Sequence, residues 1–122
     1  MFLRSVNELT AMEPVGTPRL FASVQYVGES YDNAVLLGQC EISTENQNFN
    51  QTFFFGMRVR RTGTQPIGTS NSIGEYEVPC VVTLPALLIA DLRYGDVIDC
   101  LVGNGGAANW FFAEHGFMVM IR

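Results

Sequence analysis

Two side chains near the C-terminus have the types needed for acid–base chemistry. His115 is the single histidine of the 122-residue chain and follows Glu114, so a hydrogen bond between them would let the imidazole donate or accept a proton. No serine or cysteine stands in a recognisable nucleophile motif with this pair, and a cupin-like barrel would need several histidines around a metal. We therefore expect no enzyme activity and interpret His115 as a loop or interface residue.

Three aspartates, Asp91, Asp96 and Asp99, are close enough in sequence to offer oxygen ligands to calcium. Their spacing matches no calcium-binding loop, and the two-residue period of a strand places Asp96 and Asp99 on opposite sides. The glycine-rich stretch GNGGAAN (103–109) lacks the strand-to-helix context of a phosphate-binding loop and is typical of a hairpin tip. We expect no metal site and no cofactor.

The three cysteines, Cys40, Cys80 and Cys100, are an odd number without a CxxC pair. Each lies in a strand-like run, where a free cysteine behaves as a small buried hydrophobe. This pattern does not predict a disulfide framework, and a reducing site of synthesis follows.

The one cluster of charge consists of Arg58, Arg60 and Arg61. Two interpretations stay open. The cluster is either the solvated face of a strand or a basic strip that meets an acidic neighbour, which would be Glu75 and Glu77 or the acidic face of another protein. The formal net charge of −5 argues against nucleic acid as a partner.

The length predicts one domain. Hydrophobic residues make up 48% of the chain and charged residues 16%, well below the usual charged fraction of about 25%. This composition indicates a folded domain that hides some of its surface against partners. No stretch approaches the length of a membrane span, and the N-terminus lacks the apolar segment of a signal peptide, so we expect neither.

Short runs rich in β-forming residues dominate the chain, and no long helix or internal repeat is evident. We expect strands over 20–27, 34–42, 52–61, 75–84, 96–102, 110–113 and 116–121. The stretch Thr62–Gly74 is predicted to be a long loop, and Leu84–Leu92 is either a helical turn or an extended connector. The pattern predicts an all-β domain over residues 20–122, an antiparallel β-sandwich or barrel.

Residues 1–19 are predicted to form an extended N-terminal arm. Pro14 and Pro18 keep its second part extended, whereas the apolar spacing of its first part also suits a short helix. We expect the arm to dock on a partner or to fold back on its own domain. Its candidate contact residues are Phe2, Leu3, Val6, Leu9 and Met12.

The final strand is apolar on both faces. Phe117, Val119 and Ile121 share one face, and Met118 and Met120 share the other. A strand of this kind lies either in the centre of a packed sandwich or at a subunit axis. Both interpretations stay open, and Met118 and Met120 are the candidate interface residues.

The second half of the chain contains a Leu-x-x-Gly-Asp-x-Ile turn that leads into a strand, followed by an aromatic-rich final strand. A Tyr-x-Val-Pro stretch precedes it. The matching residues are Tyr76, Val78, Pro79, Leu92, Gly95, Asp96, Ile98 and Phe117. This part resembles the end of the tumour-necrosis-factor and complement-globular-head jelly rolls. The resemblance implies a jelly-roll sandwich that forms a homotrimer, a fold that recurs in viral capsid, decoration and fibre-head proteins.

These features together predict a structural virion protein. We expect a bacteriophage capsid decoration (cement) protein that trimerises, binds the major capsid protein and bridges neighbouring capsid subunits. It would be made in the host cytoplasm and reside on the capsid surface. Such a protein needs contact area rather than a pocket. The alternative is the receptor- or glycan-binding head of a phage fibre or tail, with Tyr31, Asn71 and Trp110 on its recognition surface.

Overall fold

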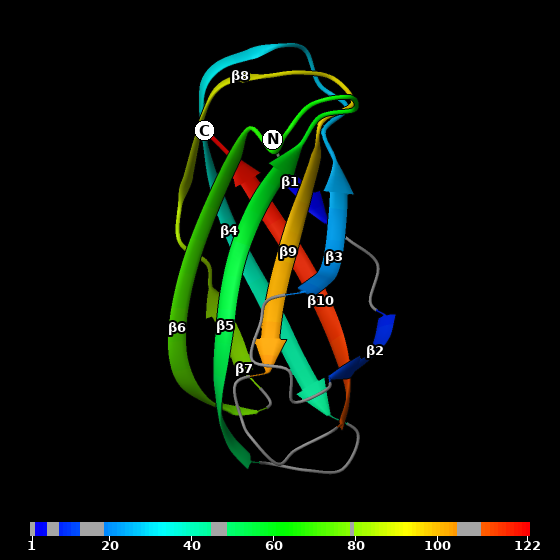
Figure 1. Ribbon diagram of the computed structural model, residues 1–122, viewed down its shortest axis with the longest axis vertical. Helices are drawn as coiled ribbons and strands as arrows, with labels where there is room; N and C mark the ends of the chain where they lie inside the picture. Colours follow the sequence, from blue (N-terminus) through cyan, green and yellow to red (C-terminus); the bar gives the residue numbers. More distant parts are fainter. Residues whose placement is uncertain (1, 5–7, 13–18, 45–48, 79, 105–110) are drawn as a thin grey trace.

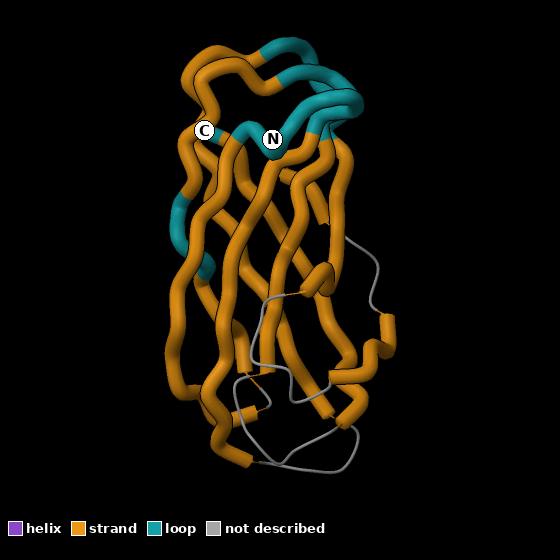
Figure 2. Tube along the Cα trace, viewed as in Figure 1, coloured by secondary structure: helices purple, strands orange, loops and turns teal. Residues whose placement is uncertain are grey.

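The computed structural model describes residues 2–4, 8–12, 19–44, 49–78, 80–104 and 111–122. The regular structure within them is entirely β, as Figure 1 and Figure 2 show. Its ten strands are β1 (Phe2–Arg4), β2 (Glu8–Met12), β3 (Arg19–Gln25), β4 (Tyr31–Thr44), β5 (Phe49–Arg60), β6 (Gly68–Val78), β7 (Cys80–Thr83), β8 (Leu87–Leu92), β9 (Val97–Asn104) and β10 (Phe111–Ile121). The prediction of an all-β domain is confirmed.

The strands form two antiparallel sheets that pack face to face. Sheet A has β10 and β4 at its centre; β1 and β2 pair with the free edge of β10, and β7 and β8 pair with the free edge of β4. Sheet B has the order β3-β9-β5-β6 and lies in front of sheet A in Figure 1. β1 and β2 lie along one edge of β10 and together fill one strand position. β7 and β8 do the same along the edge of β4, so each sheet has four strand positions.

The order in which the chain visits the sheets is that of a jelly roll. From sheet A it passes to β3 in sheet B, returns for β4, and then enters sheet B again for β5 and β6. It continues to β7 and β8 in sheet A, to β9 in sheet B, and ends with β10 in sheet A. Eight strand positions divided in this way between two sheets make the jelly-roll sandwich, so this prediction is also confirmed.

The core lies between the sheets and is built from alternate residues of each strand. Phe53 and Phe55 of β5, together with Phe117 of β10, are its largest fully buried side chains. The sheets pack closely at Gly38 in β4, where a Cβ would lie 2.5 Å from the sulfur of Met57 on β5 and this side chain would have to shift. Because Phe117 and Val119 are fully buried, one of the two apolar faces of β10 belongs to the core.

Two expectations for connecting segments were wrong. Most of Thr62–Gly74, predicted as a loop, belongs to β6, which begins at Gly68 and pairs with β5 along its whole length. Its small polar residues are tolerated because β6 is an edge strand with many exposed side chains. The stretch 103–109 does not close a hairpin, since β9 and β10 belong to different sheets.

The described parts of the first 19 residues are strands rather than a helix. β1 pairs with Met118–Met120 of β10, and β2 pairs with Phe111–His115 of the same strand. Leu3 is partly buried against the core. These segments therefore extend sheet A of their own domain. Val6, Pro14 and Pro18 lie outside the described residues.

Candidate functional site

The residues considered first for catalysis lie in β10. The backbone of His115 pairs with Glu8 of β2 and Ile42 of β4, and Glu114 precedes it in the same strand. The side chains of Glu114 and His115 lie outside the described part of the structure. Within the described residues, no group of three or more His, Cys, Asp or Glu side chains is placed to hold a metal ion.

All three cysteines are free thiols. Cys40 of β4 and Cys100 of β9 are buried, and Cys80 of β7 is partly buried. A hydrogen bond with Cys40 and burial raise the pKa of Cys100 well above its usual range, and burial also raises the pKa of Cys80. Because the thiolate is the reactive form, these two groups are poor nucleophiles and act as packing residues.

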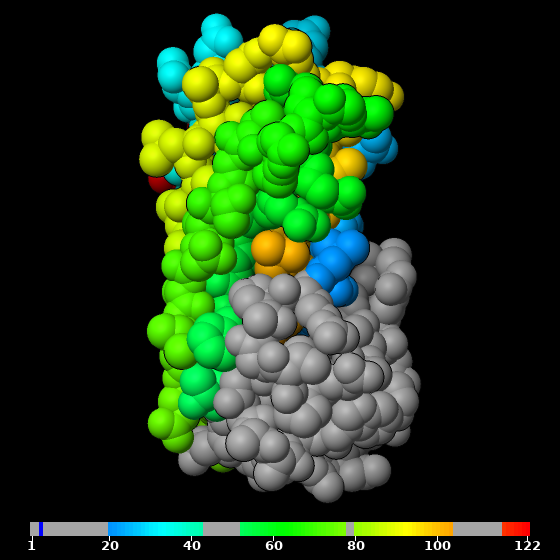
Figure 3. Space-filling view, in the orientation of Figure 1, coloured from blue at the N-terminus to red at the C-terminus, as the bar shows by residue number. Residues whose placement is uncertain are grey.

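A fully buried carboxylate, Asp99, organises the outer face of sheet B. Its neighbours in β9, Ile98 and Cys100, belong to the core, so the side chain of Asp99 lies on the opposite, outer side of the sheet. Its exposed fraction is nevertheless 0%. In Figure 3, which views this face, residues of β6 and β5 (green), β9 (orange) and β3 (blue) come to the surface side by side.

Donors from both neighbouring strands surround Asp99. On one side, the Ser23 hydroxyl of β3 donates to Oδ1 at 2.7 Å. On the other side, Arg58 Nε donates to Oδ2 at 2.9 Å, Arg60 Nη2 donates to Oδ1 at 2.9 Å, and Arg60 Nε also donates to Oδ2. Burial alone would raise the pKa of Asp99, but the hydrogen bonds with Arg60, Ser23 and Arg58 outweigh it, and the pKa is lowered. The carboxylate is thus held in its charged form.

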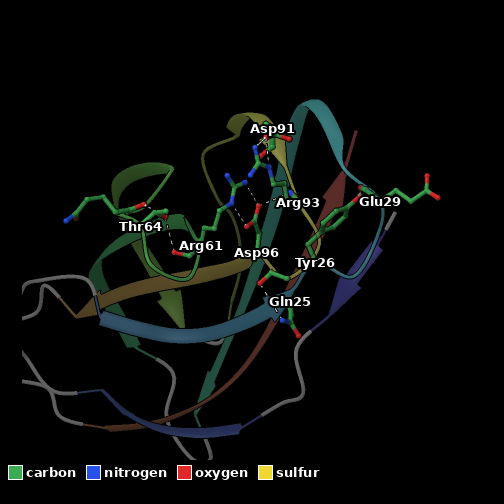
Figure 4. A network of polar contacts seen from close by, with 10 residues as sticks. Gln25, Tyr26, Glu29, Arg61, Thr64, Asp91, Arg93 and Asp96 are labelled. Carbon is green, nitrogen blue, oxygen red and sulfur yellow. Dashed lines mark hydrogen bonds and ion pairs between the residues drawn. The ribbon is translucent and has the colours of Figure 1, made fainter.

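A second ionic group surrounds Asp96 at the end of the sandwich where β5, β8 and β9 meet (Figure 4). Arg61 binds Asp96 with both prongs of its guanidinium, Nε to Oδ1 and Nη2 to Oδ2, each at 2.9 Å. Arg61 Nη2 also donates to the Asp91 carbonyl at 2.8 Å. Arg61, which follows β5 of sheet B, is thereby tied to the end of β8 in sheet A.

Gly95 and Asp96, which lead into β9, each have a structural role in the turn that they form. The Asp96 amide donates to the Arg93 carbonyl at 3.0 Å, and the Arg93 amide donates to Asp96 Oδ2 at 2.8 Å, so the turn is closed from both directions. Gly95 has a φ of 92°, which favours glycine. Burial alone would raise the pKa of Asp96, but the hydrogen bonds from Arg61 and from the Arg93 amide outweigh this effect. The pKa of Asp96 is therefore lowered.

The arginine cluster therefore meets acidic neighbours within its own chain. They are Asp99 and Asp96 rather than Glu75 and Glu77, which sequence patterning had suggested. Contrary to the expectation from alternation, Asp96 precedes β9 and lies in the turn.

The outer side of sheet A carries a group of apolar side chains, beside the exposed polar residues Gln39, Glu41 and Thr83. We call this group the sheet A apolar face and define it by Val35, Leu37, Val81, Leu88, Met118 and Met120. Each of these residues alternates with core residues along its strand. Cross-strand pairing brings Leu88 beside Val35 and Met120 beside Leu37. Leu88 is 73% exposed and Val81 60% exposed.

A hollow of about 300 Å³ lies within this face. Its lining residues are Leu37, Gly38, Gln39, Thr83, Met118 and Met120. The two methionines predicted as interface residues therefore lie together on the outside of the sandwich, half-buried, while Phe117 and Val119 of the same strand are fully buried in the core.

Four of the other predicted contact residues lie in the strands that pair with β10, and one of them, Leu3, pairs with Val119. The backbone of Phe2 pairs with Met120, that of Leu9 with Glu114, and that of Met12 with Phe111. The arginines, by contrast, lie on sheet B. The predicted interface residues that the structure describes thus separate into a group in sheet A and a group in or directly after β5 of sheet B.

Comparisons with protein-family models, with curated proteins and with solved structures found no match to this chain. None of the described residues forms a helix long and apolar enough to cross a membrane.

The first prediction concerns the substitution Asp99→Asn, which keeps the shape of the side chain and removes its charge. We expect the free energy of unfolding to fall by about 2–3 kcal/mol, because hydrogen bonds to charged groups contribute about 1.5–3 kcal/mol each and the arginines regain water only in part. Urea unfolding followed by circular dichroism measures this change.

Asp91→Asn is the matched control. Its ion pair with Arg93 is largely exposed, at 41% and 58% for the two side chains, and such pairs contribute at most about 1 kcal/mol. Equal losses in the two variants would contradict the structural role assigned to Asp99.

The second prediction concerns acid. The folded-state pKa values of Asp96 and Asp99 lie below their ordinary value of 3.8, so their stabilisation is complete above that value and is lost as the pH falls through the folded-state values. The stability advantage of the wild type over Asp99→Asn should be constant above about pH 5 and shrink toward pH 2. Thermal unfolding of both proteins across this range tests it; a constant difference throughout would show that Asp99 has an ordinary pKa.

Proposed function

We propose that this chain is a self-associating structural protein, a capsid decoration protein that assembles as a homotrimer. The observation that carries the proposal is the sheet A apolar face. It supports a role based on contact between protein surfaces.

Leaving the apolar side chains of this face in water is unfavourable in free energy. Contiguous exposed apolar patches on small domains mark interaction sites, and fully burying a leucine or methionine side chain stabilises a structure by about 1.5–3 kcal/mol. Leu88 and Val81 are mostly exposed, and Leu37, Met118 and Met120 are half-buried around the hollow. In a closed ring of copies, equivalent apolar side chains of this face would meet around the symmetry axis.

The choice of three copies rests on the fold. The sequence resembles trimeric jelly rolls around the turn at Gly95 and Asp96, and the strand order agrees with a jelly roll. Closed symmetry is the rule for soluble oligomers. With β10 and β4 at the centre of sheet A, packing of this sheet around a three-fold axis would bury Leu37 and Met120 near the axis.

The charged groups support a structural role over a catalytic one. Asp96 and Asp99 are both engaged by arginines of the same chain, and the two perturbed thiols, Cys80 and Cys100, are shifted toward the unreactive form. These groups fix the fold. The chain is small and carries few charged residues. Both features suit a virion subunit whose surface is covered by neighbouring subunits.

The third prediction is that the purified protein is a trimer in solution and that Met120→Glu converts it to a monomer. A carboxylate in the centre of an apolar interface leaves a buried charge without a partner, which costs several kcal/mol. Light scattering coupled to size exclusion measures the mass, and circular dichroism verifies the fold of the variant.

Ser30→Glu serves as the control, since it makes the same change in charge at an exposed position between β3 and β4. It should remain a trimer. A monomeric wild type at high concentration, or a Met120→Glu trimer, would exclude the sheet A apolar face as the interface.

The fourth prediction addresses the capsid. If the protein is a decoration protein, the wild type should co-sediment with undecorated capsids of the virus that encodes it and raise the temperature at which they break open. A trimer that does not bind capsids would retain the self-association but contradict the decoration role. Saturable binding to immobilised glycans instead would favour the fibre-head alternative.

A further inference from the structure

A notch of about 230 Å³ opens at the end of β5. It is lined by Arg60, Arg61, Thr62, Thr64, Pro66 and Val97. Two arginines therefore line one small concave surface, and no carboxylate-bearing residue is among its lining residues.

Each of these arginines forms an ion pair with an aspartate. Arg60 uses Nε and Nη2 for Asp99, and Arg61 uses Nε and Nη2 for Asp96. For both arginines, Nη1 has no hydrogen-bond partner among the residues that the structure describes. A guanidinium carries five N–H donors in a fixed fork. Its remaining donors can bind an acceptor while the ion pair stays intact.

The turn that follows β5 is also fixed in place. The Thr64 amide donates to the Arg61 carbonyl at 3.1 Å, and the Thr64 hydroxyl donates to the same carbonyl at 3.0 Å. Gly63 has a φ of 79°, which lets the chain turn tightly at this point. Side chains and backbone are thus ordered before any ligand arrives, which reduces the entropic cost of binding.

The ion pairs around the notch contain one more arginine than aspartate. Four arginines, Arg58, Arg60, Arg61 and Arg93, face three aspartates in the two ionic groups, whereas the whole chain has a net charge of −5. The distant negative charge is screened beyond about 8–10 Å at physiological salt. An anion at the notch experiences mainly the exposed sides of Arg60, which is 44% exposed, and Arg61, which is 24% exposed.

We propose that this notch binds an oxyanion, either a phosphate group or the carboxylate of an acidic partner residue. Planar guanidinium groups recognise both through paired N–H···O bonds. This site is separate from the proposed self-association, because none of its lining residues belongs to the sheet A apolar face.

The fifth prediction is that inorganic phosphate and acetate, titrated separately, shift the backbone amide signals of Thr62 and Thr64 and the Nε–H signals of Arg60 and Arg61 in a saturable way. Nuclear magnetic resonance of the intact chain measures the shifts. Chloride at equal ionic strength should not reproduce them. Tighter saturation by phosphate would assign the site to a phosphate ligand, and tighter saturation by acetate to a carboxylate.

The decisive variant is Thr62→Glu, which places a carboxylate of the chain itself at the notch. Thr62 is exposed, so the fold should be retained while the affinity for the added anion falls at least tenfold. Ala86→Glu, at an exposed position between β7 and β8, makes the same change in charge elsewhere and should bind as the wild type does. Shifts that do not saturate, shifts equally produced by chloride, or unchanged binding by Thr62→Glu would overturn the proposal.

Discussion

The requirement to neutralise Asp99 organises one half of this sandwich. A carboxylate removed from water is costly unless charged donors surround it, and here the donors come from both neighbouring strands, Ser23 of β3 and Arg58 and Arg60 of β5. The pairing of β3, β9 and β5 is therefore fixed by side chains as well as by backbone hydrogen bonds. A shift of β5 by one residue would turn the arginines toward the core and leave Asp99 unpaired. The Asp96 group extends the same principle to the end of the sandwich, where Arg61 ties together segments of both sheets.

Sheet A is held by different means. Its central strands, β4 and β10, carry apolar residues on both sides over part of their length, and the core takes one side of each. The other side remains as the apolar face, with Met120 beside Leu37 and Leu88 beside Val35. Stability of the monomer does not require this second apolar side, since polar residues on the outer face of a sandwich would keep the fold and improve its solubility. The proposed self-association would give this second apolar side a role.

The sequence was sufficient for the class of fold but not for the ionic groups. Alternation in β10 correctly predicted which side chains share a face, because a two-residue period is a local property of the chain. The partners of Arg60 and Arg61 could not be predicted in the same way. They depend on the register between β5 and β9, which are separated by more than 35 residues, and local spacing does not encode that register. A usable signal was present in Asp99, a charged residue between Ile98 and Cys100, which belong to an apolar run.

The dependence on distant pairing also explains β6. Gly, Ser and Thr favour a loop by propensity, whereas pairing with β5 makes this segment an edge strand.

The two halves of the molecule lead to a division of roles that follows from the sandwich itself. Two sheets packed through one core leave two outer faces, and in this chain the faces differ in kind: sheet A presents aliphatic and methionine side chains, and sheet B presents arginines anchored by aspartates. Apolar contacts between copies are non-directional and depend on area, whereas guanidinium groups select a ligand by geometry and charge. Association through sheet A would leave the notch at Arg60 and Arg61 facing outward in every copy. Self-assembly and ligand recognition would then use opposite surfaces, so that neither needs to be released for the other to occur.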